Sequence, residues 1–62
     1  MKISIGTRLL VTDAVRQKHA CKVVQIADGW AKYEGVNPAD PHYGAFAVAM
    51  LPRLAKKIRV VA

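Results

Sequence analysis

The pair Asp28-Gly29 constrains the fold more than any other feature of this sequence. It separates two segments rich in β-branched and aromatic residues, Ala20 to Ala27 and Trp30 to Val36. A two-residue turn of type I′ needs positive φ at both central positions, which glycine adopts freely and aspartate tolerates. The sequence therefore predicts a β-hairpin across these two segments.

The segments around the hairpin divide into a strand, a loop and a turn. Ile3 to Thr12 is rich in isoleucine, leucine, valine and threonine, which favour a strand. Asp13 to His19 lacks apolar periodicity and is expected to be an exposed loop. Asn37 to Pro41 contains two prolines, which remove two backbone donors, so a turn is expected there.

The segment from Gly44 to Leu51 admits two interpretations. Alanines alternate with larger apolar residues, which favours a strand with Phe46 on one face and a smooth alanine face on the other. Such an alanine face would let another subunit approach closely. The alternative is a helix near residues 41–51, with Asp40 as its N-cap before Pro41. We favour the strand.

The rest of the chain completes an all-β prediction. Pro52 is expected to end the preceding element, Arg53 to Lys57 to form one short helical turn, and Ile58 to Val61 to form the last strand. The fold class is thus five short strands with a helical turn before the last, and the helical alternative would make it α+β.

This order of elements resembles the Src-homology-3-like small barrel, an architecture shared by Tudor and KOW domains and by small plasmid-borne dihydrofolate reductases. The resemblance covers nearly the whole chain and rests on Gly6-Thr7-Arg8-Leu9, Ala27-Asp28-Gly29-Trp30 and Leu51-Pro52-Arg53-Leu54. It implies a five-stranded barrel. The reductase active-site string has its nearest match in Val24-Gln25-Ile26-Ala27, which lacks the tyrosine and falls in the wrong strand, so reductase activity is not expected.

Chain length allows one small basic domain, residues 1–62. Domains of this size commonly need disulfides, metal or self-association for stability. The single cysteine, Cys21, cannot close an internal disulfide, so a homodimer is the expected support and a reducing, cytoplasmic location is expected. No apolar run is long enough for a membrane span, and the start lacks the apolar core of a signal peptide.

Basic residues outnumber acidic ones by ten to four and form two groups. The first, Arg16, Lys18 and Lys22, occupies the first long loop and the strand after it. The second lies near the C-terminus and comprises Arg53, Lys56, Lys57 and Arg59. In barrels of the type that the chain resembles, the corresponding loop and helical turn flank the main ligand groove. The two groups are therefore expected to line one basic groove that holds nucleic acid, DNA or RNA, through its phosphates.

Two other interpretations of the charge stay open. The cations would also keep a very apolar small domain soluble. Alternatively, the protein is a regulator or inhibitor that docks on an acidic protein surface, an interpretation that the apolar run Phe46 to Leu51 favours as an edge for pairing with another chain.

The aromatic residues divide between core and contact. Trp30 and Phe46 are expected in the core, because so small a core needs its large side chains. Tyr33 and Tyr43 are the expected contact residues, since their hydroxyls favour a partly wet position. An exposed Trp30 beside a lysine would instead form a platform for the bases of a single strand.

No catalytic, cofactor or metal site is expected. His19, Cys21 and His42 supply fewer soft ligands than the four of a structural zinc site. Cys21 is flanked by valines and is expected to be a small buried hydrophobe. The four carboxylates are scattered, and the glycines are isolated, so neither paired acid and base chemistry nor a phosphate-cradling loop is predicted. The sequence predicts a non-enzymatic binding module.

Overall fold

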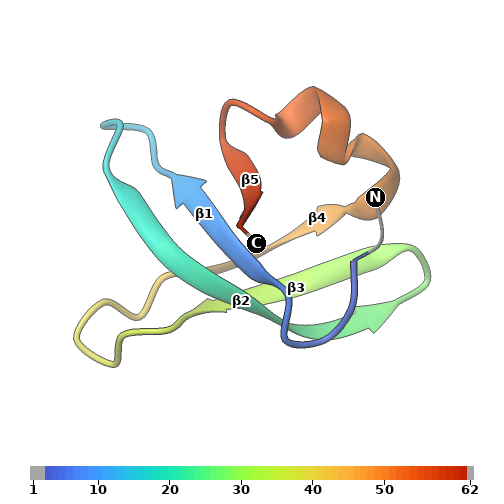
Figure 1. The fold of residues 1–62 in the computed structure, drawn as a ribbon, viewed down its shortest axis with the longest axis horizontal. Coiled ribbons are helices and arrows are strands. Elements are labelled where there is room, and N and C mark those ends of the chain that lie inside the picture. The colour runs from blue at the N-terminus through green and yellow to red at the C-terminus, as the bar shows by residue number, and fades with distance from the viewer. Residues whose placement is uncertain (1–2, 62) are drawn as a thin grey trace.

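A computed structural model describes residues 3–61 as a single five-stranded antiparallel sheet in the order β4-β3-β2-β1-β5 (Figure 1). The strands are β1 (Arg8–Thr12), β2 (Lys18–Ala27), β3 (Trp30–Gly35), β4 (Tyr43–Ala47) and β5 (Ile58–Val61), and a 3-10 helix, η1 (Val48–Leu54), precedes β5. The all-β prediction, with five strands and a short helical segment before the last, is confirmed. In residues 3–61, no helix has the length and apolar character needed to cross a membrane.

The predicted hairpin joins β2 to β3. Asp28 and Gly29 have φ values of 53° and 78°, so both central residues of the turn lie in the left-handed region that a type I′ turn requires. The turn places Trp30 opposite Ala27 and fixes the register of the ladder from that end. The hairpin was predictable because its signal is local.

Strand β2 is long and bent, and it carries the curvature of the sheet. Its register with β3 shifts between Val23 and Gln25, which is the signature of a β-bulge and increases local twist. The sheet curls so that β1 and β5 face back toward β4 (Figure 1). Within residues 3–61 no ladder joins β4 to β5. The sheet therefore does not close into the barrel that the resemblance implied. Helix η1 connects these two edge strands instead.

The core fills the concave side of the curled sheet. Its buried members in residues 3–61 come from every strand and from η1, and no buried polar or charged residue is found among them: Leu9, Val11, Cys21, Val23, Ala31, Tyr33, Phe46, Leu51 and Ile58. Full burial of a side chain such as Leu9 contributes about 2 kcal/mol of transfer free energy. Phe46 and Cys21 are buried as predicted.

Trp30 and Tyr33 exchange the roles that were predicted for them. Trp30 is 54% exposed and Tyr33 only 9% exposed. The hairpin register is the physical reason, because the alternation along β3 directs Ala31 and Tyr33 to the core and turns Trp30 outward. The prediction of a core tryptophan is therefore wrong, and the partly exposed position expected for Tyr33 is not found.

The ends of three predicted elements also differ. Strand β1 begins at Arg8 and not at Ile3, because a turn at Ser4 to Thr7 precedes it, with Gly6 at a φ of 94°. Strand β4 ends at Ala47, and the chain continues as η1, so the strand prediction holds only for its first half and the helix alternative for residues 41–51 is wrong. Pro52 lies inside η1 and does not end it.

The helical segment begins earlier than predicted because the chain must cross from β4 at one edge of the sheet to β5 at the other. Helix η1 spans that gap and buries Leu51 against the core. It ends at Leu54, and the turn before β5 is closed by a hydrogen bond from Lys57 N–H to the Leu54 carbonyl. The predicted turn Arg53 to Lys57 therefore corresponds to the last residues of η1 and the turn after it.

Candidate anion-binding surface

The outer side of β1, β2 and β5 carries a concentration of cations. Along β1, Leu9 and Val11 point to the core, so Arg8, Leu10 and Thr12 point outward. Their partners in the ladders share this side: Lys22, Ala20 and Lys18 on β2, and Val61 and Arg59 on β5. Alternation along three paired strands thus places the basic side chains of β1, β2 and β5 on one surface.

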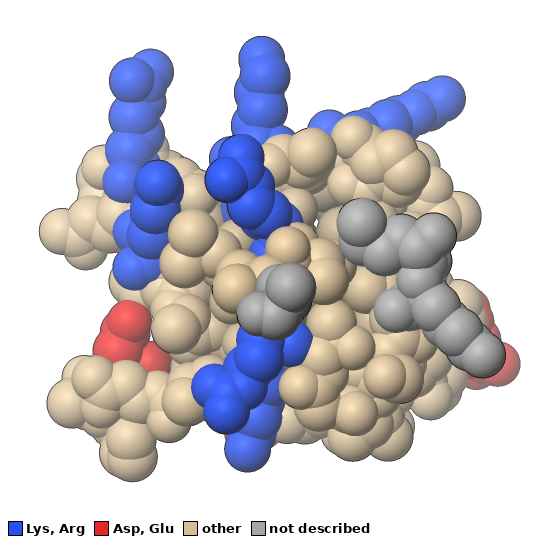
Figure 2. All heavy atoms as spheres, viewed as in Figure 1, with Lys and Arg blue, Asp and Glu red and all other residues tan. Residues whose placement is uncertain are grey.

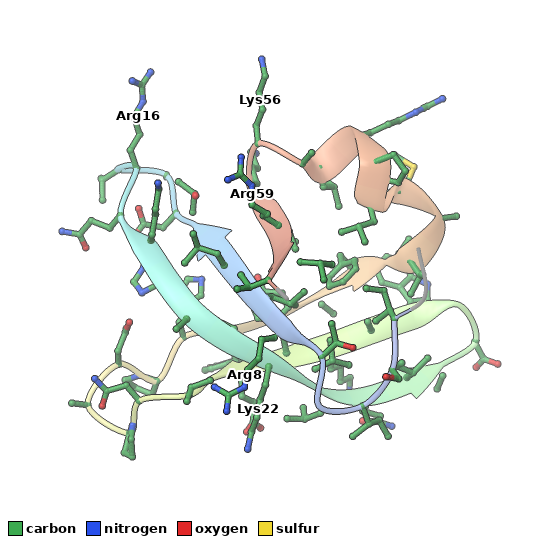
Figure 3. The ribbon with its side chains drawn as sticks, viewed as in Figure 1. Arg8, Arg16, Lys22, Lys56 and Arg59 are labelled. Carbon is green, nitrogen blue, oxygen red and sulfur yellow. The ribbon has the colours of Figure 1, made fainter. Side chains whose placement is uncertain are left out.

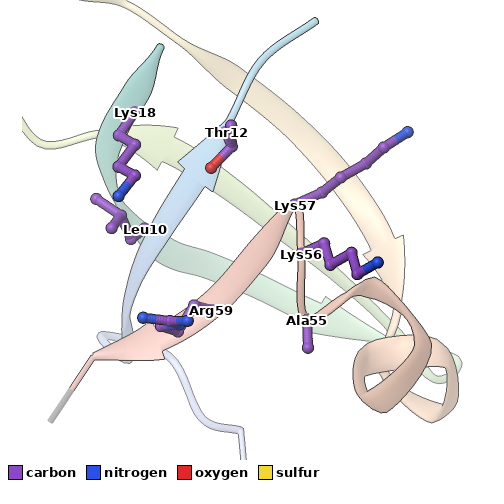
Figure 4. Close-up of a pocket in the computed structure, with 7 residues that line it drawn as sticks. All are labelled: Leu10, Thr12, Lys18, Ala55, Lys56, Lys57 and Arg59. Carbon is purple, nitrogen blue, oxygen red and sulfur yellow. The ribbon is translucent and has the colours of Figure 1, made fainter. Parts of the chain in front are cut away.

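A hollow of about 380 Å³ lies at one end of this surface (Figure 4). Its basic lining comes from both predicted groups, with Lys18 from the first and three residues from the second; the complete lining is Leu10, Thr12, Lys18, Ala55, Lys56, Lys57 and Arg59. Lys18 on β2 and Arg59 on β5 lie on either side of Leu10 (Figure 4). We call this the basic hollow.

Backbone pairing fixes the position of the basic hollow. Thr12 N–H donates a hydrogen bond of 2.7 Å to the Lys57 carbonyl, and Thr12 is the ladder partner of Lys18. The early and late basic groups meet because β1 lies between β2 and β5 in the sheet. Their meeting is thus a consequence of topology.

The other predicted basic residues lie around the hollow or away from it. Arg16, on the tip of the loop between β1 and β2, extends from the same end of the molecule as Lys56 (Figure 3). Lys22 lies with Arg8 at the opposite end, and Arg59 lies between these ends. Arg53, on η1, is exposed and does not line the hollow.

Arg8 is a member of this surface that the sequence analysis did not select. It is exposed and is the ladder partner of Lys22. The signal was present in the alternation of Arg8, Leu9, Leu10 and Val11, which places an arginine on the outer side of the first strand. It was missed because Arg8 stands outside both basic groups along the chain.

The cations of this surface are not neutralised by the acidic residues that the structure describes. In residues 3–61, both ion pairs involve His19, and no lysine or arginine takes part in one. Figure 2 shows basic side chains over the upper and central part of this view, with acidic side chains at its two sides. A surface of unpaired positive charge attracts polyanions over the range of a Debye length.

Two of the carboxylates are bound by His19, which the sequence analysis considered only as a metal ligand. Asp13 Oδ2 lies 2.8 Å from His19 Nε2, and Asp40 Oδ2 lies 2.6 Å from His19 Nδ1. The ring of His42 stacks on His19 with 4.2 Å between centroids. Two carboxylates accept hydrogen bonds at the two ring nitrogens, so the imidazolium form of His19 fits this arrangement.

The electrostatics of this histidine cluster follow from those contacts. The hydrogen bond that His19 donates to Asp13 is the largest cause of its raised pKa, followed by the one that it donates to Asp40. The same contact with His19 lowers the pKa of Asp13. Asp40 therefore holds the histidine instead of capping a helix, and the loop before β4 is tied to β2 by it.

Two further groups that could take part in chemistry, the Cys21 thiol and the Tyr33 hydroxyl, belong to buried residues. Burial raises the pKa of the Cys21 thiol, which favours its protonated form. Burial also raises the pKa of Tyr33, whose ring packs against Phe46 and His42. Across the described part of the chain, no three His, Cys, Asp or Glu residues are grouped to hold a metal ion. Tyr43 is 78% exposed and available for contact.

Comparison with protein-family models, with curated proteins and with solved structures found no match. The likeness to Src-homology-3-like barrels therefore stays a prediction.

Proposed function

We propose that this protein is a non-enzymatic module that binds nucleic acid through the phosphate backbone, on the outer side of β1, β2 and β5. The observation that carries the proposal is the basic hollow, where Lys18 stands with Lys56, Lys57 and Arg59 and no acidic residue contributes to the lining. Converging cations in a hollow raise the local concentration of anions. Phosphates that bind there release condensed counterions, which drives association.

The uncharged side chains at the hollow favour a ligand that is bound through its phosphate backbone. Leu10 lines the hollow, its ladder partner Ala20 lies beside it on β2, and Thr12 supplies a hydroxyl beside Lys18. These side chains are shorter than the lysines and the arginine around them, so an extended polyanion can approach while the long cations reach its phosphates. Sequence-specific recognition is not needed for this mode of binding.

The proposal of an acidic protein partner loses its main support. Phe46 and Leu51, the two ends of the apolar run that favoured it, are both buried in the core. Met50 is the exposed large side chain of that run. The homodimer and the cytoplasmic location remain our proposals, on the grounds of small size and a single buried cysteine.

The test is the salt dependence of binding to a fluorescein-labelled duplex of mixed sequence, measured by anisotropy. Four phosphate contacts predict a slope of about −3.6 in a plot of log K against log salt concentration, which is roughly a 150-fold loss between 50 and 200 mM salt. A binding constant that does not change with salt concentration, or no binding at low salt, would contradict the proposal.

Matched variants locate the contact. Lys18→Gln and Arg59→Gln each remove one charge from the hollow and should each reduce the slope by about 1. Asn37→Asp lowers the net charge by the same amount on the loop before β4, outside the hollow. It should leave the slope unchanged. Equal effects of all three variants would show that only net charge matters.

A further inference from the structure

The outer side of β3 and β4 exposes two aromatic rings that the fold does not use. Trp30 on β3 is 54% exposed and Tyr43 on β4 is 78% exposed. Trp30 is the ladder partner of Ala47, and Tyr43 is the partner of Glu34. Alternation along both strands directs both rings away from the core, which Ala31 and Phe46 fill on the other side.

The surface between the two rings carries both charged and apolar side chains. Lys32 lies between Trp30 and Glu34 along β3, and its partners are Ala45 on β4 and Gln25 on β2. A second hollow of about 470 Å³ lies here and is lined by Val24, Gln25, Lys32, Tyr33, Glu34, Tyr43, Gly44 and Ala45. It offers a cation and an amide beside an exposed ring.

This aromatic surface is continuous with the cations of β1 and β2. One row of ladder partners crosses the whole sheet on its outer side: Val61, Arg8, Lys22, Glu34 and Tyr43. Neighbouring strands are about 4.8 Å apart, so Tyr43 lies roughly 10 Å from Lys22 along the sheet. Phosphates held by Lys22 and Arg8 would therefore bring the attached bases within reach of the rings.

We propose that the nucleic acid bound by this protein is single-stranded, with bases stacked on Trp30 and Tyr43. The inference rests on the proposed function and names its ligand. Bases of a duplex stack on one another and cannot lie on a side chain, whereas every base of a single strand offers a π-face to an aromatic ring. Strand rise and strand spacing place the two rings roughly 14 Å apart. They therefore hold two bases that are not adjacent.

Glu34 is the one acidic residue on this path, next to Lys22 and Tyr43 in the ladders. Its carboxylate repels the phosphates of a strand that runs from the basic hollow to the rings. Glu34→Gln should therefore tighten binding to a single strand, because it removes this repulsion while keeping the size of the side chain. A weaker affinity in this variant would contradict the proposed path.

The direct experiment uses the emission of Trp30, the single tryptophan of the chain. The protein is titrated at low salt with a single strand of thymidine nucleotides and, separately, with a mixed duplex of the same length. We expect the single strand to bind more tightly and to quench the emission, and the duplex to bind through charge alone with the emission unchanged.

Variants separate stacking from charge. Trp30→Ala and Tyr43→Ala should each weaken single-strand binding by roughly fivefold or more, measured by anisotropy, and leave duplex binding unchanged. Trp30→Phe keeps a ring and should retain most of the affinity. Met50→Ala is the matched control, since Met50 is an exposed apolar residue on η1 that does not line the hollow beside Tyr43, and it should change neither affinity. Circular dichroism confirms that each variant is folded.

The outcomes distinguish this inference from the proposed function. If both polymers bind equally and the alanine variants bind like the wild type, the stacking inference is overturned and the backbone proposal stands. If Trp30→Ala changes only the mass in solution by light scattering, the rings form a contact between copies and the inference is likewise overturned. If neither polymer binds at low salt, both proposals fail.

Discussion

His19 joins three segments that are far apart along the chain. Asp13 belongs to the turn after β1, His19 to β2, and Asp40 to the loop before β4. His42 stacks on the ring, and the buried Cys21 and Tyr33 lie on the same inner side of the sheet. The charge on this one imidazole therefore decides whether both carboxylates remain hydrogen-bonded to β2.

The stability of the protein should fall as the pH rises. The pKa of His19 is raised in the folded state above its ordinary value of 6.5, with Asp13 as the main cause. Its contribution is fully present below pH 6.5 and is lost as the pH rises through the folded-state pKa. Urea unfolding across this range should show the decline in the wild type and a flatter profile in His19→Gln. Identical profiles would refute the role of His19.

Gly44 is required because a tyrosine ring crosses it. A Cβ at this position would lie 2.5 Å from the hydroxyl oxygen of Tyr33. Gly44→Ala should lower the free energy of unfolding by about 1–3 kcal/mol, since the ring must leave its place against Phe46. Thermal or urea unfolding measures the loss. The loss should be smaller in a Tyr33→Phe background, and an equal loss there would show that the hydroxyl is not the cause.

At the scale of single residues, sequence reasoning succeeded where burial follows from residue type. Phe46 and Cys21 are buried as their apolar character indicated. It failed for Trp30 and Tyr33. The face of the sheet to which each side chain points is decided by the first residue of β3 that pairs with β2 after the turn. The pairing of His19 with Asp13 and Asp40 joins residues up to 21 positions apart, and no local pattern encodes such a contact.

The hairpin between β2 and β3 illustrates how an element can be set by two residues. Gly29 has a φ of 78°, and nothing lies within 4 Å of a Cβ added there. Gly29→Ala should therefore cost about 1 kcal/mol of stability through backbone strain alone. Asp28→Asn is the control, because asparagine also tolerates positive φ. Urea unfolding of both variants is the measurement, and an undiminished stability of Gly29→Ala would contradict the predicted turn.

The ends of β4 and β1 were less predictable, because they depend on contacts with distant parts of the chain. The alternation from Gly44 onward is typical of one strand, yet the chain leaves the sheet after Ala47 to bury Leu51 and to reach the position of β5 beside β1. The start of β1 was predicted too early, because the turn at Gly6 interrupts an apolar sequence without a proline or a charged residue. In both cases tertiary packing overrides the local preference.

In the whole molecule, the order of the strands brings the basic groups together on a surface apart from the carboxylates that His19 binds. The early and late basic groups meet because β1 is placed between β2 and β5, which no composition or spacing dictates. Two carboxylates are meanwhile held by His19. The sequence predicted that basic groups would share a surface. It did not predict that Lys22 pairs with Arg8 at one end, apart from the hollow at the other.

The central claim is that the basic hollow holds the phosphates, and amide chemical shifts report the location most directly. A labelled sample is titrated with a short mixed duplex, and the shifts of all amides are followed. We expect the largest changes at Leu10, Lys18, Lys57 and Arg59, and small changes in the loop of residues 36–42. Changes centred on that loop or on the Asp28-Gly29 turn, with the hollow unaffected, would contradict the account.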